Sequence, residues 1–204
     1  KRPIKRWLGV SRILVAIHYA LSKYLNDPSF KQKQAERQRK ALLQYKRAKR
    51  LVDALRAKYS KLLILRVDLC WKNQNLEDLN LKKLKSTLRA YFKRFHHAPA
   101  LPKIVGYIWK LEFGQQKGYH HHCLFFLNGN KYQNDAYYAE QIGSYWCEFT
   151  QDQGFYFNCN RNRLNYRHLA IGMAKHTDQA MFDNLDKVLV YICKQDQFII
   201  DKHL

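Results

Sequence analysis

Three consecutive histidines, His120 to His122, lie in the apolar segment YHHHCLFFL, which is typical of a β-strand. Alternate residues of a strand share one face, so His120 and His122 point one way and His121 points the other. Two imidazoles side by side form a two-pronged site for a divalent metal ion. The alternatives are surface histidines that face solvent, or a structural zinc site that lacks its fourth ligand.

A carboxylate in the preceding segment can complete this site. Residues 103–113 and 119–127 predict two strands around the short loop 114–118, which is a hairpin signal. If these five loop residues are unpaired, Glu112 falls directly opposite His120, with Cβ atoms roughly 5 Å apart. A slip of one residue would move Glu112 to the other face of the sheet.

Two imidazoles and a carboxylate with open positions suit a cation that must also bind a phosphate. Mg²⁺ or Mn²⁺ is the expected ion, although Zn²⁺ would bind too. The same register places Lys110 opposite His122. A lysine next to a metal is explained if it contacts a substrate phosphate.

A second group of chemical interest lies near the end of the chain, where DNLDKVLVYICKQD predicts a helix. Tyr191 and Lys194 are three residues apart and therefore share a face of that helix. A phenol has a pKa near 10, and a nearby cation or metal favours the phenolate, which can attack phosphorus. A packing role for Tyr191 is the alternative, because its neighbours Leu189, Val190 and Ile192 are apolar.

The elements that must position these groups follow the order β-α-β-β-α-β. A strand over KLLILRVDLCW is followed by a helix from Asn75 to Phe95, the hairpin, a helix from about Asn134 to Thr150, and a strand in GFYFNC. This order is that of the ferredoxin-like split unit, an α+β fold with an antiparallel sheet. Helices cover one face of such a sheet and leave an open face, against which the last helix is free to pack.

The first 60 residues have a different character. From Pro28 to Ser60 the chain has no glycine and is rich in basic helix formers, which predicts one long helix or two. We therefore divide the chain into a basic helical extension, 1–60, and a second domain, 61–204. The extension is either a solvated helix packed by a narrow apolar stripe or a contact to a DNA backbone. Near the start of this extension, the apolar segment WLGVSRILVAIHYAL is too short to span a membrane.

Composition limits the class of partner. The 37 Lys and Arg against 16 Asp and Glu give a net charge of +21, which favours nucleic acid or an acidic membrane surface. The five cysteines are an odd number without a C-x-x-C pair, so we expect reduced thiols and a cytoplasmic protein.

Several segments together resemble the HUH endonucleases, and more closely the replication initiators of filamentous phages (inoviruses) and related prophage proteins. The matching segments appear in family order from about Lys61 to Ile200. The block that joins the hairpin to the His-x-His strand is the most specific of them. In chain order they are LLILRVDLCW, WKLEFGQQKGYHHHCLFFLNGN, IGSYWC, GFYFNCN and VYICKQDQFI.

The resemblance implies a metal-dependent nickase that starts rolling-circle replication by cutting one DNA strand and joining itself to the 5′ phosphate. His120 and His122 match the metal histidines, Glu112 the third ligand, Tyr191 the nucleophile and Lys194 its partner. Single-stranded or hairpin origin DNA is the implied substrate, and host helicase and polymerase are the implied partners. No membrane partner is expected.

Other residues follow from the same match or from charge. Asp68 lies in the first motif, where it supports a histidine or contacts DNA. The middle residue of the histidine motif is usually hydrophobic, and His121 departs from this. Candidate DNA contacts are Arg66, Lys110, Arg161, Arg163, Arg167 and Lys175.

Three other functions are compatible with these residues. A transposase or relaxase of the same superfamily would share the chemistry. A phosphodiesterase that uses water would leave Tyr191 structural. A non-catalytic binder of single-stranded nucleic acid would use the sheet and its aromatic side chains for stacking.

Overall fold

The computed structural model describes residues 4–72, 81–114 and 118–194, with side chains from Arg12 onward. The chain divides into two compact units, Lys1–Leu43 and Gln44–Leu204.

The first unit holds helix α1 (Ile4–Asn26) and the beginning of helix α2 (Pro28–Lys58). Asp27 separates the two helices, and its side chain accepts a hydrogen bond from the backbone N–H of Phe30 at 2.9 Å. A capping aspartate followed by proline at the first helical position is a strong start signal for α2. Helix α1 lies within the predicted helical extension 1–60, for which no helix bounds were predicted before Pro28. No helix in the described part of the chain is long and apolar enough to cross a membrane.

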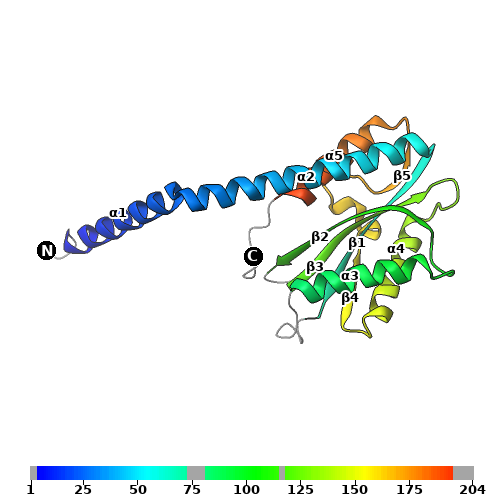
Figure 1. The fold of residues 1–204 in the computed structure, drawn as a ribbon, viewed down its shortest axis with the longest axis horizontal. Coiled ribbons are helices and arrows are strands. Elements are labelled where there is room, and N and C mark those ends of the chain that lie inside the picture. The colour runs from blue at the N-terminus through cyan, green and yellow to red at the C-terminus, as the bar shows by residue number, and fades with distance from the viewer. Residues whose placement is uncertain (1–3, 73–80, 115–117, 195–204) are drawn as a thin grey trace. The chain divides into compact units, whose positions relative to one another are not determined.

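The second unit is built on a five-stranded antiparallel sheet. Strands pair in the order β2-β3-β1-β4, and the short strand β5 also pairs with β1, so β1 and β3 are central (Figure 1). The strands are β1 (Lys61–Trp71), β2 (Ile104–Gly114), β3 (Gly118–Asn128), β4 (Gly154–Asn158) and β5 (Gly172–Lys175).

Three α-helices connect or follow these strands: α3 (Leu81–His96), α4 (Asp135–Phe149) and α5 (Gln179–Cys193). The predicted order β-α-β-β-α-β is confirmed by β1-α3-β2-β3-α4-β4. The expected start of α3 at Asn75 lies outside the described residues.

Helix α5 begins four positions earlier than expected because Asp178 caps it. The Asp178 side chain accepts a hydrogen bond from the backbone N–H of Met181 at 3.1 Å. Strand β5 lies in a segment that the sequence left unassigned.

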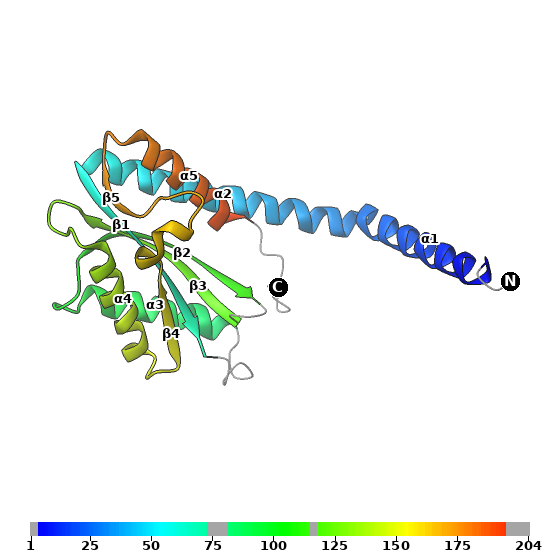
Figure 2. The same cartoon turned by 180° about the vertical axis from the view of Figure 1, so that it is seen from behind.

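One face of the sheet is covered by α3 and α4 (Figures 1 and 2). Tyr91 of α3 is fully buried and donates a hydrogen bond to the carbonyl of Ile142 at 2.9 Å, and Trp146 donates to the carbonyl of Cys70 at 3.1 Å. These bonds satisfy two polar groups within an otherwise apolar layer. The alternate residues of β1 in that layer are Leu63, Leu65, Val67, Leu69 and Trp71.

The opposite face is only half open. Helix α5 packs there, as the sequence allowed, but the last part of α2 packs there too, which the sequence did not indicate. The two helices are joined by the hydroxyl of Tyr45, which donates to Asp186 at 2.8 Å. The buried members of this layer are Ala48, Val52 and Leu55 of α2, Phe182, Leu185, Leu189, Ile192 and Cys193 of α5, and Leu62, Ile64, Leu124, Phe126, Ala170 and Ala174.

Asn160 closes a gap beside β1, between the residues that pair with β5 and those that pair with β4. Its side chain accepts from the backbone N–H of Arg66 at 2.8 Å and donates to the carbonyl of Ile64 at 3.2 Å. The amide therefore takes the place of a neighbouring strand. Asn160 belongs to the 3-10 segment Cys159–Asn165, and its side-chain amide also donates to Asp135 at 2.7 Å.

All five cysteines are free thiols.

The packing of α2 against the sheet can be tested with two leucines of the same helix. Leu55 is 5% exposed and would lie 2.7 Å from a methyl group added at Gly106, whereas Leu42 is 51% exposed. Leu55→Ala should lower the free energy of unfolding by about 2–5 kcal/mol, and Leu42→Ala should change it by less than about 0.5 kcal/mol. Urea denaturation measures both, and equal values would contradict the described packing.

Candidate metal centre

The half-covered sheet face changes from apolar to polar along its strands. On β1 the residues of this face run from Ile64 to Arg66 and Asp68, and the β3 residue paired with Asp68 is His122. Because side chains alternate along a strand, the polar residues continue the same face that α2 and α5 cover. The polar end of this face holds the candidate site.

The register predicted for the hairpin is confirmed. Glu112 pairs with His120, and Lys110 pairs with His122. The loop residues 115–117 lie outside the described residues, but the strand pairing up to Gly114 and Gly118 fixes the register.

Glu112, His120 and His122 form a cluster that could hold a metal ion. One ligand atom from each residue lies within 4.8 Å of the others. The Nε2 atoms of the two histidines are 3.2 Å apart, and Nε2 of His122 is 3.0 Å from Oε2 of Glu112. Both histidines are buried and Glu112 is half-buried, so the three donor atoms converge where little water reaches them.

The outer nitrogens of the two histidines are already engaged. Nδ1 of His120 lies 3.0 Å from the carbonyl oxygen of Gly118, and Nδ1 of His122 lies 2.7 Å from Oδ1 of Asp68. Because both oxygens are acceptors, Nδ1 of each histidine carries a proton. When the imidazole is neutral, its Nε2 is then the free base that a metal ion can bind. Histidines that bind metals are held in this tautomer by the same kind of partner. The donor set therefore fits a divalent cation.

The surroundings of Glu112 and His120 shift their pKa values toward the forms that bind a metal ion. The hydrogen bond from His122 lowers the pKa of Glu112 to about 2 against the effect of burial, and the charges of His122 and Lys110 act in the same direction. Burial lowers the pKa of His120, which favours the neutral imidazole.

His122 behaves differently. Burial acts to lower its pKa, but hydrogen bonds to Asp68 and Glu112 outweigh that effect and raise the pKa above its ordinary value. A proton therefore competes with a metal ion for His122.

Two cations border the cluster. Lys110 is buried, and its Nζ lies 3.1 Å from Oε1 of Glu112. The guanidinium of Arg66 lies 3.6 Å from Oδ1 of Asp68 through Nε, and 5.1 Å from the centre of the Tyr166 ring. Tyr166 belongs to no predicted motif, and no sequence signal marks it.

Lys110 also joins the site to the end of α5. Its Nζ donates to the backbone carbonyl of Lys194, the residue that caps α5, at 2.7 Å. The ammonium of Lys194 lies 4.3 Å from the centre of the Tyr191 ring, and Tyr191 is 44% exposed. Burial lowers the pKa of Arg66, but Asp68 and, more weakly, Tyr191 help to raise it above its ordinary value.

His121 points to the opposite face, as expected from strand alternation. Its ring lies between Trp109 and Trp146, with ring centres 5.7 and 6.2 Å away. Neither ring nitrogen has a hydrogen-bond partner among the described residues, and burial lowers its pKa to about 3. The side chain is therefore a neutral core residue, and a hydrophobic residue would suit the position equally well.

The remaining candidate DNA contacts lie elsewhere. Arg163 forms an ion pair with Asp135, and Arg161 pairs with Glu140 at 3.3 Å. Both arginines belong to the 3-10 segment after β4. Arg167 and Lys175 are exposed, and Lys175 ends β5.

The fold and the site define an α+β protein whose sheet carries a buried His-X-His pair and a glutamate that could hold a metal ion, consistent with an HUH-like motif. The family model described as the YagK/YfjJ C-terminal domain matches residues 25–203. The match covers most of the chain, which therefore belongs to this family. No match was found among curated proteins or among solved structures.

Metal binding can be tested with neighbouring residues of β3 and its partner strand. His122→Ala removes a ligand, and Asp68→Ala removes the acceptor that orients it, so the affinity for Mn²⁺ should fall, by about 10–100-fold for Asp68→Ala and further for His122→Ala. His121→Leu serves as the matched control, because its side chain lies on the other face and its variant should bind Mn²⁺ like the parent. Isothermal titration calorimetry measures all three, and unchanged binding in His122→Ala would refute the site.

Proposed function

We propose that this protein is a metal-dependent endonuclease of the HUH type, which nicks single-stranded DNA through Tyr191 and starts rolling-circle replication. One observation carries the proposal: Glu112, His120 and His122 converge on one face of the sheet, and Lys110 links that cluster to the end of the helix that bears Tyr191. In this account residues 61–204 form the nuclease domain and residues 1–60 a basic extension.

The metal would be held by Nε2 of His120, Nε2 of His122 and a carboxylate oxygen of Glu112. A bound Mg²⁺ or Mn²⁺ would polarise the scissile phosphate and neutralise part of its charge. The choice between these ions is a proposal based on the oxygen and nitrogen donors, and Zn²⁺ would also fit them.

Other residues of the chain would orient the metal ligands and bind the DNA phosphates. Asp68 holds His122 in the tautomer that presents Nε2 to the metal. The ammonium of Lys194 lies 4.3 Å from the centre of the Tyr191 ring, where it would neutralise the charge of the scissile phosphate. Arg66 and Lys110 offer positive charge to the phosphates on either side of the cut.

The proposed step is a transesterification. The Tyr191 phenol loses its proton, its oxygen forms a bond to phosphorus, and the bond from phosphorus to the 3′ oxygen breaks. The 3′ oxygen takes up a proton and becomes a hydroxyl, while the 5′ phosphate stays on Tyr191. One phosphodiester is exchanged for another, so the reverse reaction can rejoin the strand without an added energy source.

The proposed substrate is single-stranded or hairpin origin DNA, and a host helicase and polymerase would act on the product. The net charge of +21 supports a polyanionic substrate. A transposase or relaxase would use the same residues for the same reaction.

A covalent adduct is the direct test of the nucleophile. Incubation with labelled single-stranded or hairpin oligonucleotides and Mn²⁺ should give a protein–DNA adduct, and Tyr191→Phe should reduce its yield at least about 100-fold because the attacking oxygen is gone. Tyr137→Phe is the matched control, since Tyr137 is also exposed but lies on α4.

Other outcomes would select other functions. Cleavage without an adduct, lost in His122→Ala but kept in Tyr191→Phe, would favour a phosphodiesterase that uses water. Binding of the oligonucleotide without cleavage under Mg²⁺, Mn²⁺ or Zn²⁺ would favour a non-catalytic binding protein.

A further inference from the structure

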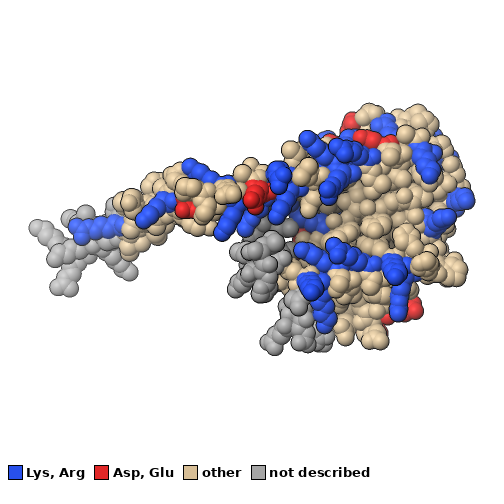
Figure 3. Space-filling model, viewed as in Figure 1, with Lys and Arg blue, Asp and Glu red and all other residues tan. Residues whose placement is uncertain are grey.

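Helix α3 carries a surface that the proposed active site does not use. It contains six Lys and Arg and no Asp or Glu over its sixteen residues. Lys82, Arg89 and Lys93 are exposed and recur at helical spacing, so they form one row along the helix. Figure 3 shows Lys and Arg side chains gathered along this helix with few acidic residues between them.

The row lies on the side of the sheet opposite to the metal centre. The apolar side of α3, with Leu84, Leu88 and Tyr91, packs on the layer that also contains His121, whereas His120 and His122 point to the other face. A strand bound at the metal centre therefore leaves this row accessible.

The chemistry of the row favours a rigid polyanion. The aromatic side chains of α3 are Tyr91, Phe92 and Phe95, and all three are buried. Helix α3 therefore offers no platform on which unpaired bases could stack. Among the described residues, no large apolar side chain of α3 is exposed, so this helix has no apolar side chain to insert into a lipid bilayer. Double-stranded nucleic acid needs neither feature, because it is bound through its phosphates.

The dimensions also suit a duplex. From Lys82 to Lys93 the helix rises about 16 Å at 1.5 Å per residue. That length exceeds the roughly 12 Å width of the major groove of DNA, so cations along the row can reach phosphates on both sides of the groove.

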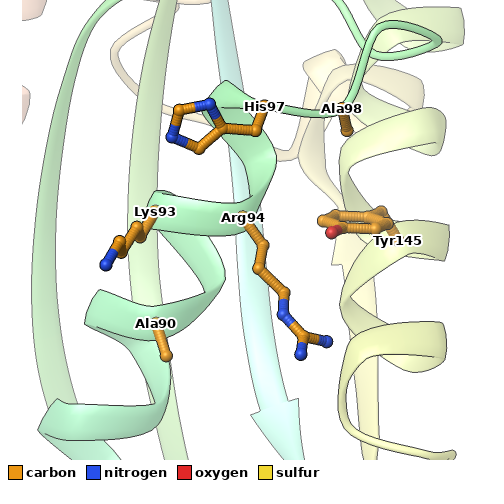
Figure 4. A pocket seen from close by; sticks show the side chains of 6 residues that line it. All are labelled: Ala90, Lys93, Arg94, His97, Ala98 and Tyr145. Atoms are coloured by element: carbon orange, nitrogen blue, oxygen red, sulfur yellow. The ribbon is translucent and has the colours of Figure 1, made fainter.

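A pocket extends the basic surface at the end of α3. It is lined by Lys93, Arg94 and His97 from the end of α3 and the following turn, and by Tyr145 of α4 (Figure 4). Arg94 lies 5.6 Å from the centre of the Phe149 ring, which holds its guanidinium toward α4. Lys93 and Arg94 bring two positive charges to the lining of this pocket, which suits a phosphate group.

We propose that α3 and this pocket bind the backbone of double-stranded DNA, so that the protein holds a duplex on one side of the sheet and a single strand on the other. The choice of DNA among polyanions rests on the proposed function, but the contact itself needs neither metal nor Tyr191. Such a surface would hold the duplex that flanks a nick site.

The test uses a blunt DNA duplex in EDTA with the full chain. A triple variant, Lys82→Gln, Arg89→Gln and Lys93→Gln, should weaken duplex binding by at least about tenfold and reduce the slope of log affinity against log salt by about 2–3. The control triple, Lys33→Gln, Arg37→Gln and Lys40→Gln, removes the same charge from exposed positions of α2 and should change the affinity less than threefold. Fluorescence anisotropy measures both.

Adduct formation with a single-stranded oligonucleotide separates this inference from the proposed function. The α3 triple variant should form the adduct at the parental yield. Equal losses of duplex affinity in the two triple variants would overturn the inference, because net charge alone would then explain binding. Loss of binding to phosphatidylglycerol vesicles with unchanged duplex affinity would overturn it in favour of a membrane surface. Absence of any adduct from the parent protein would count against the nickase and leave the duplex result standing.

Discussion

The pairing of β1 with β3 is the constraint on which the rest of the structure depends. One register places Ile64 beside Phe126 and Asp68 beside His122 on the same face. The apolar end of that face gives α2 and α5 a surface to pack on, and the polar end gives a metal ion its donors. A shift of one residue would bury the charges under the helices and expose the apolar side chains.

The two ends of the face are connected through α5. This helix is anchored by buried residues such as Leu185 and Leu189, and its last turn meets Lys110, which also pairs with Glu112. Packing and electrostatics therefore set the position of the Tyr191 helix together. In the proposed mechanism the contact between Lys110 and the Lys194 carbonyl holds the end of the Tyr191 helix beside the metal centre.

Much of the site could be predicted from the sequence because it depends on local rules. Strand alternation separates His121 from its neighbours, and the length of the hairpin loop sets Glu112 opposite His120. Three features could not be predicted, because each depends on contacts between distant segments. These are the packing of α2 on the sheet, the short strand β5, and Asn160, whose amide replaces a strand beside β1. Helix α2 is basic and has few apolar residues, so its sequence does not indicate that its second half is the buried one.

The central claim is that this sheet face holds a divalent metal ion between two histidines and a glutamate. Anomalous scattering from crystals grown with Mn²⁺ tests it most directly. We expect one strong peak within about 2.0–2.3 Å of Nε2 of His120, Nε2 of His122 and an oxygen of Glu112. A peak at other residues, or none at this site with Mn²⁺ in excess, would contradict the account.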